Sequence, residues 1–250
     1  MKKKLTATVC AVLLFIVVGL FLLIVHFFWT DHTTKHNSTT ETTITEESLK
    51  KSKEILQSQT ENNAEKSFTV YIETGHGIGD DGKWDAGCSW SNGDTTYEEA
   101  KVMIPIAQAM TKYLEKAGVK VLTDANSNNN KNLTETLNFL EKHPVDAFVN
   151  LHCDWEESES GTMALYKTDE QKKLAEALNK GVHQEIDIPD RGLTSRDDLD
   201  TLNSDQPNCP ACLYETGSIK ADNETLTKHA DEYGKGLAKG MCLFLGVEYQ

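Results

Sequence analysis

The hydrophobic pattern of residues 67–250 alternates between short runs typical of strands and longer stretches with a helical period. Residues 68–72 form a β-rich run. Apolar side chains then recur at steps of three and four from residue 102 to 114, and the period ends at Gly118. Residues 119–122 predict the next strand. Strands that alternate with helices indicate an α/β domain whose central sheet is mostly parallel.

The rest of this region continues the same alternation. Asn132 followed by Glu135 is typical of a capped helix N-terminus, and His143-Pro144 ends that helix. Five further elements are predicted: strands over 147–152 and 162–166, a helix over 169–185, a strand through 213–214 and a helix over 226–245. We therefore expect a single three-layer domain with helices flanking the sheet. The segments 77–96 and 189–208 are long for loops of this fold, so we expect them to contact a substrate.

The first 29 residues have a different pattern, in which three lysines at positions 2–4 precede a long apolar run. Residues 9–29 contain 21 residues, enough to cross the ~30 Å hydrocarbon layer at ~1.5 Å per residue. A cleaved signal peptide would have an apolar region of only ~7–15 residues followed by small residues. Here the run ends in Phe27, Phe28 and Trp29, which suit a membrane interface. The pattern favours an uncleaved transmembrane anchor over residues 1–29.

The flanking charges predict the orientation of this anchor. Because the lysines precede the apolar run, the positive-inside rule places the N-terminus in the cytoplasm and the rest of this single-pass protein outside. Residues 30–66 contain no Gly, Pro, Cys, Phe, Trp or Tyr and are dominated by polar side chains. Such a segment buries too little apolar area to fold, so it predicts a flexible polar stalk before a domain over residues 67–250. A role in binding a partner is the alternative for the stalk.

The charge balance excludes one class of partner. Residues 30–250 carry a formal charge of −17, because three of the 25 basic residues lie at the N-terminus and all 39 acidic residues lie beyond it. Nucleic acid binding needs cations opposite phosphates, so we expect no nucleic acid partner.

Several predicted strands end in residues that suit metal chemistry. His76, His152 and Glu215 each follow or close a strand. Because ligands gather outside the carboxyl ends of strands in open α/β sheets, we expect these side chains to converge. A catalytic zinc ion needs about three protein ligands and a free position for water. The third ligand is expected at the start of the helix after the first strand, where Glu98 and Glu99 stand, and a separate carboxylate is needed as general base.

In this order and spacing, the motifs resemble those of the zinc-dependent N-acetylmuramoyl-L-alanine amidases of the amidase 3 type. The resemblance covers about residues 68–245. It rests on Gly75-His76-Gly77, Asp85-Ala-Gly87, Glu99 ahead of Ile104, Ile106 and Ala107, Leu122-Thr123, Phe148-Val-Asn-Leu-His152, Arg191-Gly192 and Pro210-Ala-Cys-Leu-Tyr-Glu215-Thr-Gly217.

The resemblance implies a role for each of the candidate residues. It makes His76, Glu99 and His152 the zinc ligands and Glu215 the catalytic glutamate, with Glu99 preferred over Glu98 for its spacing to the apolar residues that follow. The implied reaction is hydrolysis of the amide between N-acetylmuramic acid and L-alanine in peptidoglycan, for cell-wall remodelling or lysis. The anchor and stalk predicted from the N-terminal pattern would hold the domain outside the cell membrane, where this polymer lies. The sequence identifies no activator protein.

This chain departs from the family pattern at several places. Glu73 replaces an aspartate, Asp124 an arginine, Cys153-Asp154 an Ala-Asn pair and Ser218 an aromatic residue. Two alternatives therefore stay open: a zinc peptidase or amidohydrolase acting on another amide, and a non-hydrolytic domain that binds the cell wall. Residues 209 and 212 form a Cys-x-x-Cys motif that could be a disulfide or a redox pair, but no thioredoxin-like βαβ pattern surrounds it. We favour the interpretation that Cys153 and Cys212 are small buried apolar residues on strands.

Overall fold

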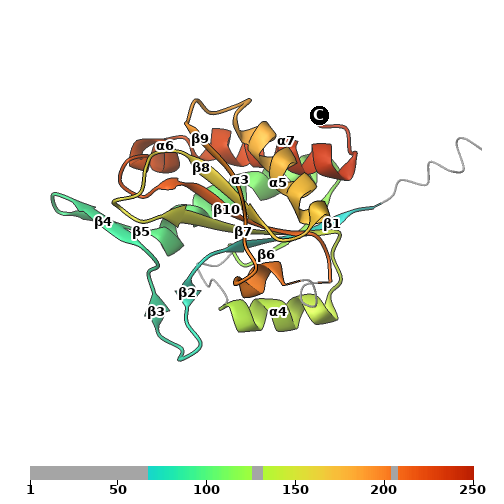
Figure 1. The fold of residues 1–250 in the computed structure, drawn as a ribbon, viewed down its shortest axis with the longest axis horizontal. Helices are drawn as coiled ribbons and strands as arrows, with labels where there is room; N and C mark the ends of the chain where they lie inside the picture. Colours follow the sequence, from blue (N-terminus) through green and yellow to red (C-terminus); the bar gives the residue numbers. More distant parts are fainter. Residues whose placement is uncertain (1–66, 126–131, 204–207) are drawn as a thin grey trace, which may run out of the picture. The chain divides into compact units, whose positions relative to one another are not determined.

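The computed structural model describes residues 67–125, 132–203 and 208–250 (Figure 1). The predicted anchor (1–29) and stalk (30–66) lie outside these residues. Among the described residues, no helix has the length and hydropathy that crossing a membrane requires. The main sheet is built from β1 (Thr69–Thr74), β6 (Lys120–Thr123), β7 (Ala147–Asp154), β8 (Thr162–Tyr166), β9 (Asp190–Ser195) and β10 (Ala211–Ser218).

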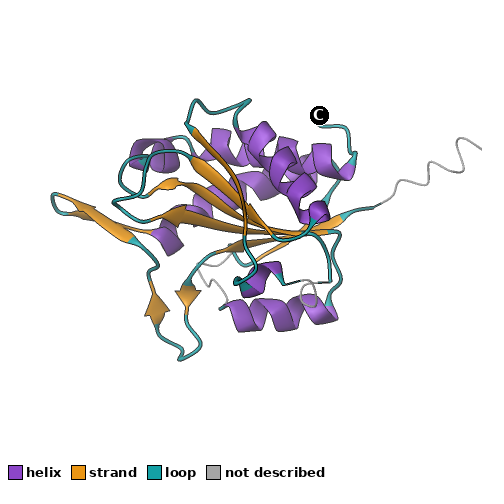
Figure 2. Cartoon of the chain, viewed as in Figure 1, coloured by secondary structure: helices purple, strands orange, loops and turns teal. Residues whose placement is uncertain are grey.

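The sheet has the strand order β6-β1-β7-β10-β8-β9. The first four strands in this order run parallel, β8 runs antiparallel to β10, and β9 runs parallel to β8. The helices are α3 (Glu99–Lys116), α4 (Leu133–Lys142), α5 (Asp169–Val182), α6 (Asn223–Lys228) and α7 (Ala230–Leu245). Figure 2 shows α4 and a short 3-10 helix (Asp200–Leu202) on one face of the sheet and the other helices on the opposite face. The predicted three-layer α/β domain with a mostly parallel sheet is confirmed.

Each face of the sheet has its own apolar core. The larger core fills the space between the sheet and α3, α5 and α7, and includes the fully buried Ile72, Met110 and Leu178. The smaller core lies on the α4 side, where the Tyr71 and Phe148 rings are 5.8 Å apart. Burial of each large side chain contributes roughly 1.5–3 kcal/mol, so both helical layers are held firmly against the sheet.

The ends of the helices follow local signals in the sequence. The Asn132 side chain accepts a hydrogen bond of 2.8 Å from the Glu135 backbone N–H, which caps α4 as predicted. Helix α5 has a complete capping box between Thr168 and Gln171, and it ends at Val182 rather than at residue 185. The predicted final helix is two helices, α6 and α7, with a break at His229.

The two segments predicted as long loops contain short strands. Segment 77–96 holds β2 (Gly77–Ile78), β3 (Trp84–Asp85), β4 (Ser89–Asn92) and the first half of β5 (Thr95–Glu98), paired as two hairpins. Figure 1 shows these hairpins projecting away from the main sheet. Segment 189–208 contains β9, an edge strand. Apolar periodicity missed these strands because most of their side chains are exposed or half-buried and polar, so pairing rather than burial defines them.

The connections place a crevice at one edge of the sheet. From β1 the chain passes through α3 to β6 on one side, and then through α4 to β7 on the other side of β1. Strand order therefore reverses at β1. Ligands of open α/β sheets bind outside the carboxyl ends of the strands at such a switch point. The residues that follow β1 and end β7 are His76 and His152 with its neighbours.

Candidate metal centre

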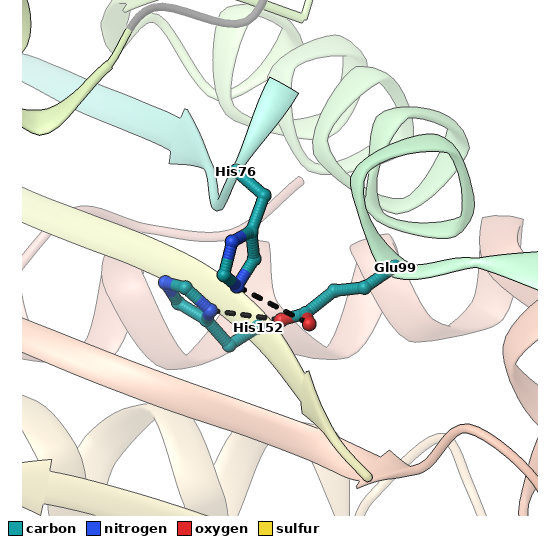
Figure 3. Close-up of side chains that lie close together, drawn as sticks. All are labelled: His76, Glu99 and His152. Carbon is teal, nitrogen blue, oxygen red and sulfur yellow. Dashed lines mark hydrogen bonds and ion pairs between the residues drawn. The ribbon is translucent and has the colours of Figure 1, made fainter. Parts of the chain in front are cut away.

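His76 lies in the turn between β1 and β2, in a conformation that few side chains adopt. Its φ angle is +65°, which makes it the one positive-φ residue other than glycine in the described part of the chain. The left-handed conformation costs an L-residue roughly 1–2 kcal/mol, so the surrounding structure must hold it. The turn directs the His76 ring toward His152, near the C-terminal end of β7, and toward Glu99, at the N-terminus of α3 (Figure 3).

Glu99 and His152 complete a cluster with His76. Glu99 is the first residue of α3 and only 2% exposed, and His152 lies near the end of β7. The Glu99 Oε2 atom lies 3.3 Å from His76 Nε2, and its Oε1 atom lies 2.8 Å from His152 Nδ1. Figure 3 shows the carboxylate facing both imidazole rings. The structure thus brings together three residues that are far apart in the sequence.

Two glycines make this close approach possible. A Cβ atom at Gly75 would lie 2.3 Å from the His152 ring. At Gly87, where φ is +67°, a Cβ atom would lie 2.5 Å from both Glu99 Oε2 and the His76 ring. Neither position has room for a side chain in this arrangement, which explains physically why the sequence motifs have glycine there.

The structure separates the two adjacent glutamates at the start of α3. The Glu98 carboxylate accepts a hydrogen bond of 2.9 Å from the Trp84 indole N–H and pairs with Lys101 at 2.8 Å. It therefore faces the β3 hairpin, while Glu99 faces the histidines. Of the two residues, Glu99 alone is positioned to bind an ion held by His76 and His152.

The cluster keeps the Glu99 carboxylate charged. Burial raises the pKa of Glu99, but hydrogen bonds to the two histidines outweigh burial and bring it well below its usual range. Burial lowers the pKa of His76, but its contacts with Glu99 and Asp85 raise it to about 9. The Glu99 carboxylate is thus a buried anion that needs positive charge nearby. Protonated imidazole rings can supply this charge, and so can one divalent cation.

The donor set fits zinc. Two histidine nitrogens and one carboxylate oxygen lie within 4.8 Å of one another, close enough to share an ion. Two histidines and one glutamate are a known ligand set of catalytic zinc, in which a further position is open to water. A second group, Cys88, Glu99 and Cys153, also lies within 4.8 Å and shares Glu99 with the first.

Asp85 supports this cluster, although the sequence identified it only as part of a family motif. Its Oδ2 atom lies 2.9 Å from His76 Nδ1, the ring nitrogen that does not face Glu99. Its Oδ1 atom accepts the Gly87 backbone N–H at 3.0 Å. A carboxylate on the second nitrogen of a ligating histidine fixes the ring orientation and tautomer. The sequence signal that could have identified Asp85 as a partner of His76 was an aspartate nine positions after the histidine, next to Gly87.

Glu215 lies on the neighbouring strand and is held differently. It pairs in register with His152 across the β10–β7 ladder and is half-buried. Its Oε2 atom is buried and has no hydrogen-bond partner among the described residues. Burial raises the pKa of Glu215 to about 7. A carboxyl group with this pKa exchanges protons readily near neutral pH.

A cavity of about 340 Å³ opens beside His76 and His152. Glu73 and Asn150, both almost fully buried, line it from neighbouring strands. Residues of both segments predicted as long loops also line it: Ile78, Gly79, Asp80, Asp85, Leu199, Asp200 and Thr201. The departure at Glu73 from the family pattern therefore lies in the cleft itself. Asp124, another departure, accepts hydrogen bonds from the N–H and hydroxyl of Thr74 and so supports the end of β1.

An α/β domain with two histidines and a carboxylate at the switch point, and a glutamate of raised pKa on the neighbouring strand, has the features of a metal-dependent hydrolase. Comparison with known proteins defines the family. The model of the N-acetylmuramoyl-L-alanine amidase family matches residues 70–245, and the chain belongs to this family. It is a peptidoglycan hydrolase that cleaves the amide between N-acetylmuramic acid and L-alanine.

Several solved structures share the fold of this chain. The N-acetylmuramoyl-L-alanine amidase AmiC2 of Nostoc punctiforme is 25% identical, with a TM-score of 0.61 over 72% of this chain and 97% of that one. An N-acetylmuramoyl-L-alanine amidase from Clostridium difficile 630 is 22% identical, with a TM-score of 0.63 over 72% and 97%. The CwlD amidase of Clostridioides difficile, solved in complex with the GerS lipoprotein, is 20% identical, with a TM-score of 0.60 over 73% and 100%. No curated protein sequence matches the chain significantly.

Proposed function

We propose that this amidase binds one zinc ion through His76, Glu99 and His152 and uses Glu215 as its general base and acid. The observation that carries the proposal is the convergence of the three donor groups within 4.8 Å at the switch point of the sheet. Zinc bound there would supply a Lewis acid for the scissile carbonyl and make a nearby water more acidic.

In this proposal, Glu215 transfers protons and Asp85 positions a zinc ligand. Glu215 takes a proton from the attacking water and passes it to the alanine nitrogen as the carbon–nitrogen bond breaks. The products are the lactyl carboxylate of N-acetylmuramic acid and a peptide with a free N-terminal amine. A pKa of about 7 suits both directions of transfer, because the group is neither too weak a base nor too weak an acid. Asp85 holds the His76 ring in place during these steps.

The N-terminal segment supports a location for this activity. The three lysines followed by 21 mostly apolar residues favour a single-pass anchor over residues 1–29, with a stalk over 30–66 that holds the catalytic domain outside the cell membrane. A membrane-attached enzyme of this kind meets the peptidoglycan that faces the membrane. Protease added to intact cells should remove the domain and leave a small membrane fragment. Release of the whole domain into the medium by cleavage near Trp29 would contradict the anchor.

The zinc proposal is tested with purified peptidoglycan. The full-length protein is incubated with it before and after treatment with a chelator, and then after zinc is added back. Mass spectrometry of the released fragments identifies the new termini. We expect free L-alanine amines and intact glycan ends, no release after chelation, and recovery with zinc. Cleavage that is unchanged by removal of all bound metal would contradict the metal site.

A further inference from the structure

Two cysteines from distant parts of the chain meet beside the metal centre. Cys88 lies in the turn between β3 and β4, and Cys153 lies in β7, directly after His152. Although 65 positions separate them, their Sγ atoms are 3.8 Å apart. The Cys88 thiol also lies 3.3 Å from the Cys153 carbonyl oxygen and 3.4 Å from that of Asp154. The β3–β4 turn is therefore already placed against β7 at this point.

Both cysteines also hold the carboxylate of Glu99. The Cys88 backbone N–H donates to Glu99 Oε2 at 2.9 Å, and the Cys153 backbone N–H donates to Oε1 at 3.1 Å. These are the oxygens that face His76 and His152. Any bond that fixes the two cysteines to each other therefore fixes the two backbone donors that orient Glu99.

We propose that Cys88 and Cys153 form a disulfide that fastens the β3–β4 turn to β7 behind the metal centre. The sulfur atoms are 3.8 Å apart and need to approach by about 1.8 Å to reach the ~2.05 Å of a disulfide. The substrate polymer lies outside the cytoplasmic membrane, where disulfides persist. Cys88 and Cys153 are free thiols in the structure, as are Cys209 and Cys212, so the proposed bond forms by oxidation of the state described and does not involve the Cys209–Cys212 motif.

The oxidant is a small-molecule or protein disulfide, and the reaction is thiol–disulfide exchange. Cys88 is half-buried and Cys153 is 3% exposed, so the external disulfide meets Cys88 first. The Cys88 sulfur attacks one sulfur of the oxidant, forms a mixed disulfide and releases one thiol. The Cys153 sulfur then attacks Cys88 and releases the second thiol. The two protons of the cysteines end on the two released thiols, and the oxidant is reduced by two electrons.

Metal binding between the sulfurs is the competing use of this pair. Cys88, Glu99 and Cys153 do lie within 4.8 Å of one another. However, both oxygens of Glu99 already face the two histidines, so an ion between the sulfurs would have only two protein ligands of its own. Structural zinc sites have four ligands and catalytic sites about three, so the disulfide is the better supported assignment.

Tryptic peptide mapping of the full-length protein tests the assignment directly. Trypsin produces peptides 84–101 and 143–167, and each contains a single cysteine. After treatment with glutathione disulfide we expect these two peptides to be cross-linked, and dithiothreitol to separate them. Cys209→Ser should keep the cross-link, and Cys88→Ser should abolish it. Glutathione that stays on Cys88 without a cross-link to Cys153 would overturn the proposal, as would a sulfur-to-metal charge-transfer band after cobalt is added to the reduced protein.

Two physical measurements test the consequence of the bond. A cross-link across 65 positions restricts the unfolded chain, so Tm of the oxidised protein should exceed that of the reduced protein by about 5–15 °C, in the Cys209→Ser variant as well. Chelator-driven release of zinc should be slower by about tenfold, because Glu99 is better held. This second readout depends on the proposed zinc site, whereas the cross-link and Tm do not. Equal release rates from both forms would overturn the link to Glu99.

Discussion

Glu99 and Glu215 lie at the same edge of the sheet, but their surroundings act on their charges in opposite directions. Glu99 faces two histidines and accepts two backbone N–H groups, and its pKa lies well below the usual range despite burial. Glu215 has a buried oxygen without a partner among the described residues, and burial raises its pKa to about 7. The number of polar partners, rather than burial, decides which carboxyl group stays charged.

This difference separates two tasks that one active site needs. A group that binds a cation must remain an anion throughout the reaction, and many donors achieve that. A group that moves protons must gain and lose its charge, so its surroundings must favour neither form strongly. Pairs of carboxyl groups with opposite pKa shifts are a recurring sign of divided roles in catalysis. The comparison therefore predicts different results when each carboxylate is removed.

The largest effect is expected at the carboxylate that stays charged. Glu99→Ala should abolish zinc binding and lower turnover by about 10³-fold or more, because a metal ion supplies several kcal/mol to the transition state. Glu98→Ala is the matched control, since its side chain contacts Trp84 and Lys101 instead. Metal analysis and turnover on purified peptidoglycan measure both. A metal-free Glu98→Ala beside an active Glu99→Ala would reverse the assignment.

Removal of the proton-transfer group should leave the metal in place. Glu215→Gln keeps the size of the side chain but cannot accept a proton, so we expect full zinc content and a loss of turnover of about 10²-fold or more. Zinc analysis and turnover of the same preparation separate the two effects. Full turnover in Glu215→Gln would disprove the role given to this residue, and loss of zinc would make Glu215 a ligand.

A smaller effect is expected from crowding the cluster without removing a ligand. Gly75→Ala places a methyl group 2.3 Å from the His152 ring, so the ring must move and zinc affinity should fall by about 10–100-fold. Gly79→Ala is the control, because its nearest neighbour would be 3.4 Å away, an ordinary contact. Competition with a chromophoric chelator measures both affinities. Equal affinities would show that the close approach is not needed.

The smallest effect concerns a charged carboxylate with no catalytic role. Glu185 pairs with Lys235 at 2.7 Å and with Lys239, and these pairs lower its pKa although burial opposes them. A carboxyl group with a lowered folded-state pKa stabilises the protein above its unfolded pKa of about 4.5, and the stabilisation is lost as pH falls through the folded value. Glu185→Gln should therefore lower the free energy of unfolding by about 1 kcal/mol at pH 7. Urea titrations should show this difference vanish in acid, and a constant difference would exclude the charge as its source.

Most of the fold could be predicted from the sequence because most helices and strands are marked by local signals, such as apolar periodicity and helix caps. The helical period before Gly118, the cap at Asn132 and the strand runs before His76 and His152 all fall where the structure has α3, α4, β1 and β7. The hairpins and β9 escaped prediction because no buried apolar pattern marks them. The break at His229 escaped it as well, since apolar residues continue on both sides.

By itself, the sequence predicted that His76, His152 and Glu215 follow or close strands, because strand periodicity and glycine motifs are local properties. In the structure His76 follows β1 and His152 lies near the end of β7, whereas Glu215 lies inside β10, which continues to Ser218. The sequence also limited the third metal ligand to Glu98 or Glu99, and the spacing to the following apolar residues, as in the amidase family, favoured Glu99. Only the tertiary structure decided which glutamate faces the histidines, because that depends on the rotation of α3 against β7. The contact of Asp85 with His76 and the approach of Cys88 to Cys153 were also decided only by the tertiary structure. The residues of these two pairs are 9 and 65 positions apart, and a folded turn, not a sequence pattern, brings them into contact.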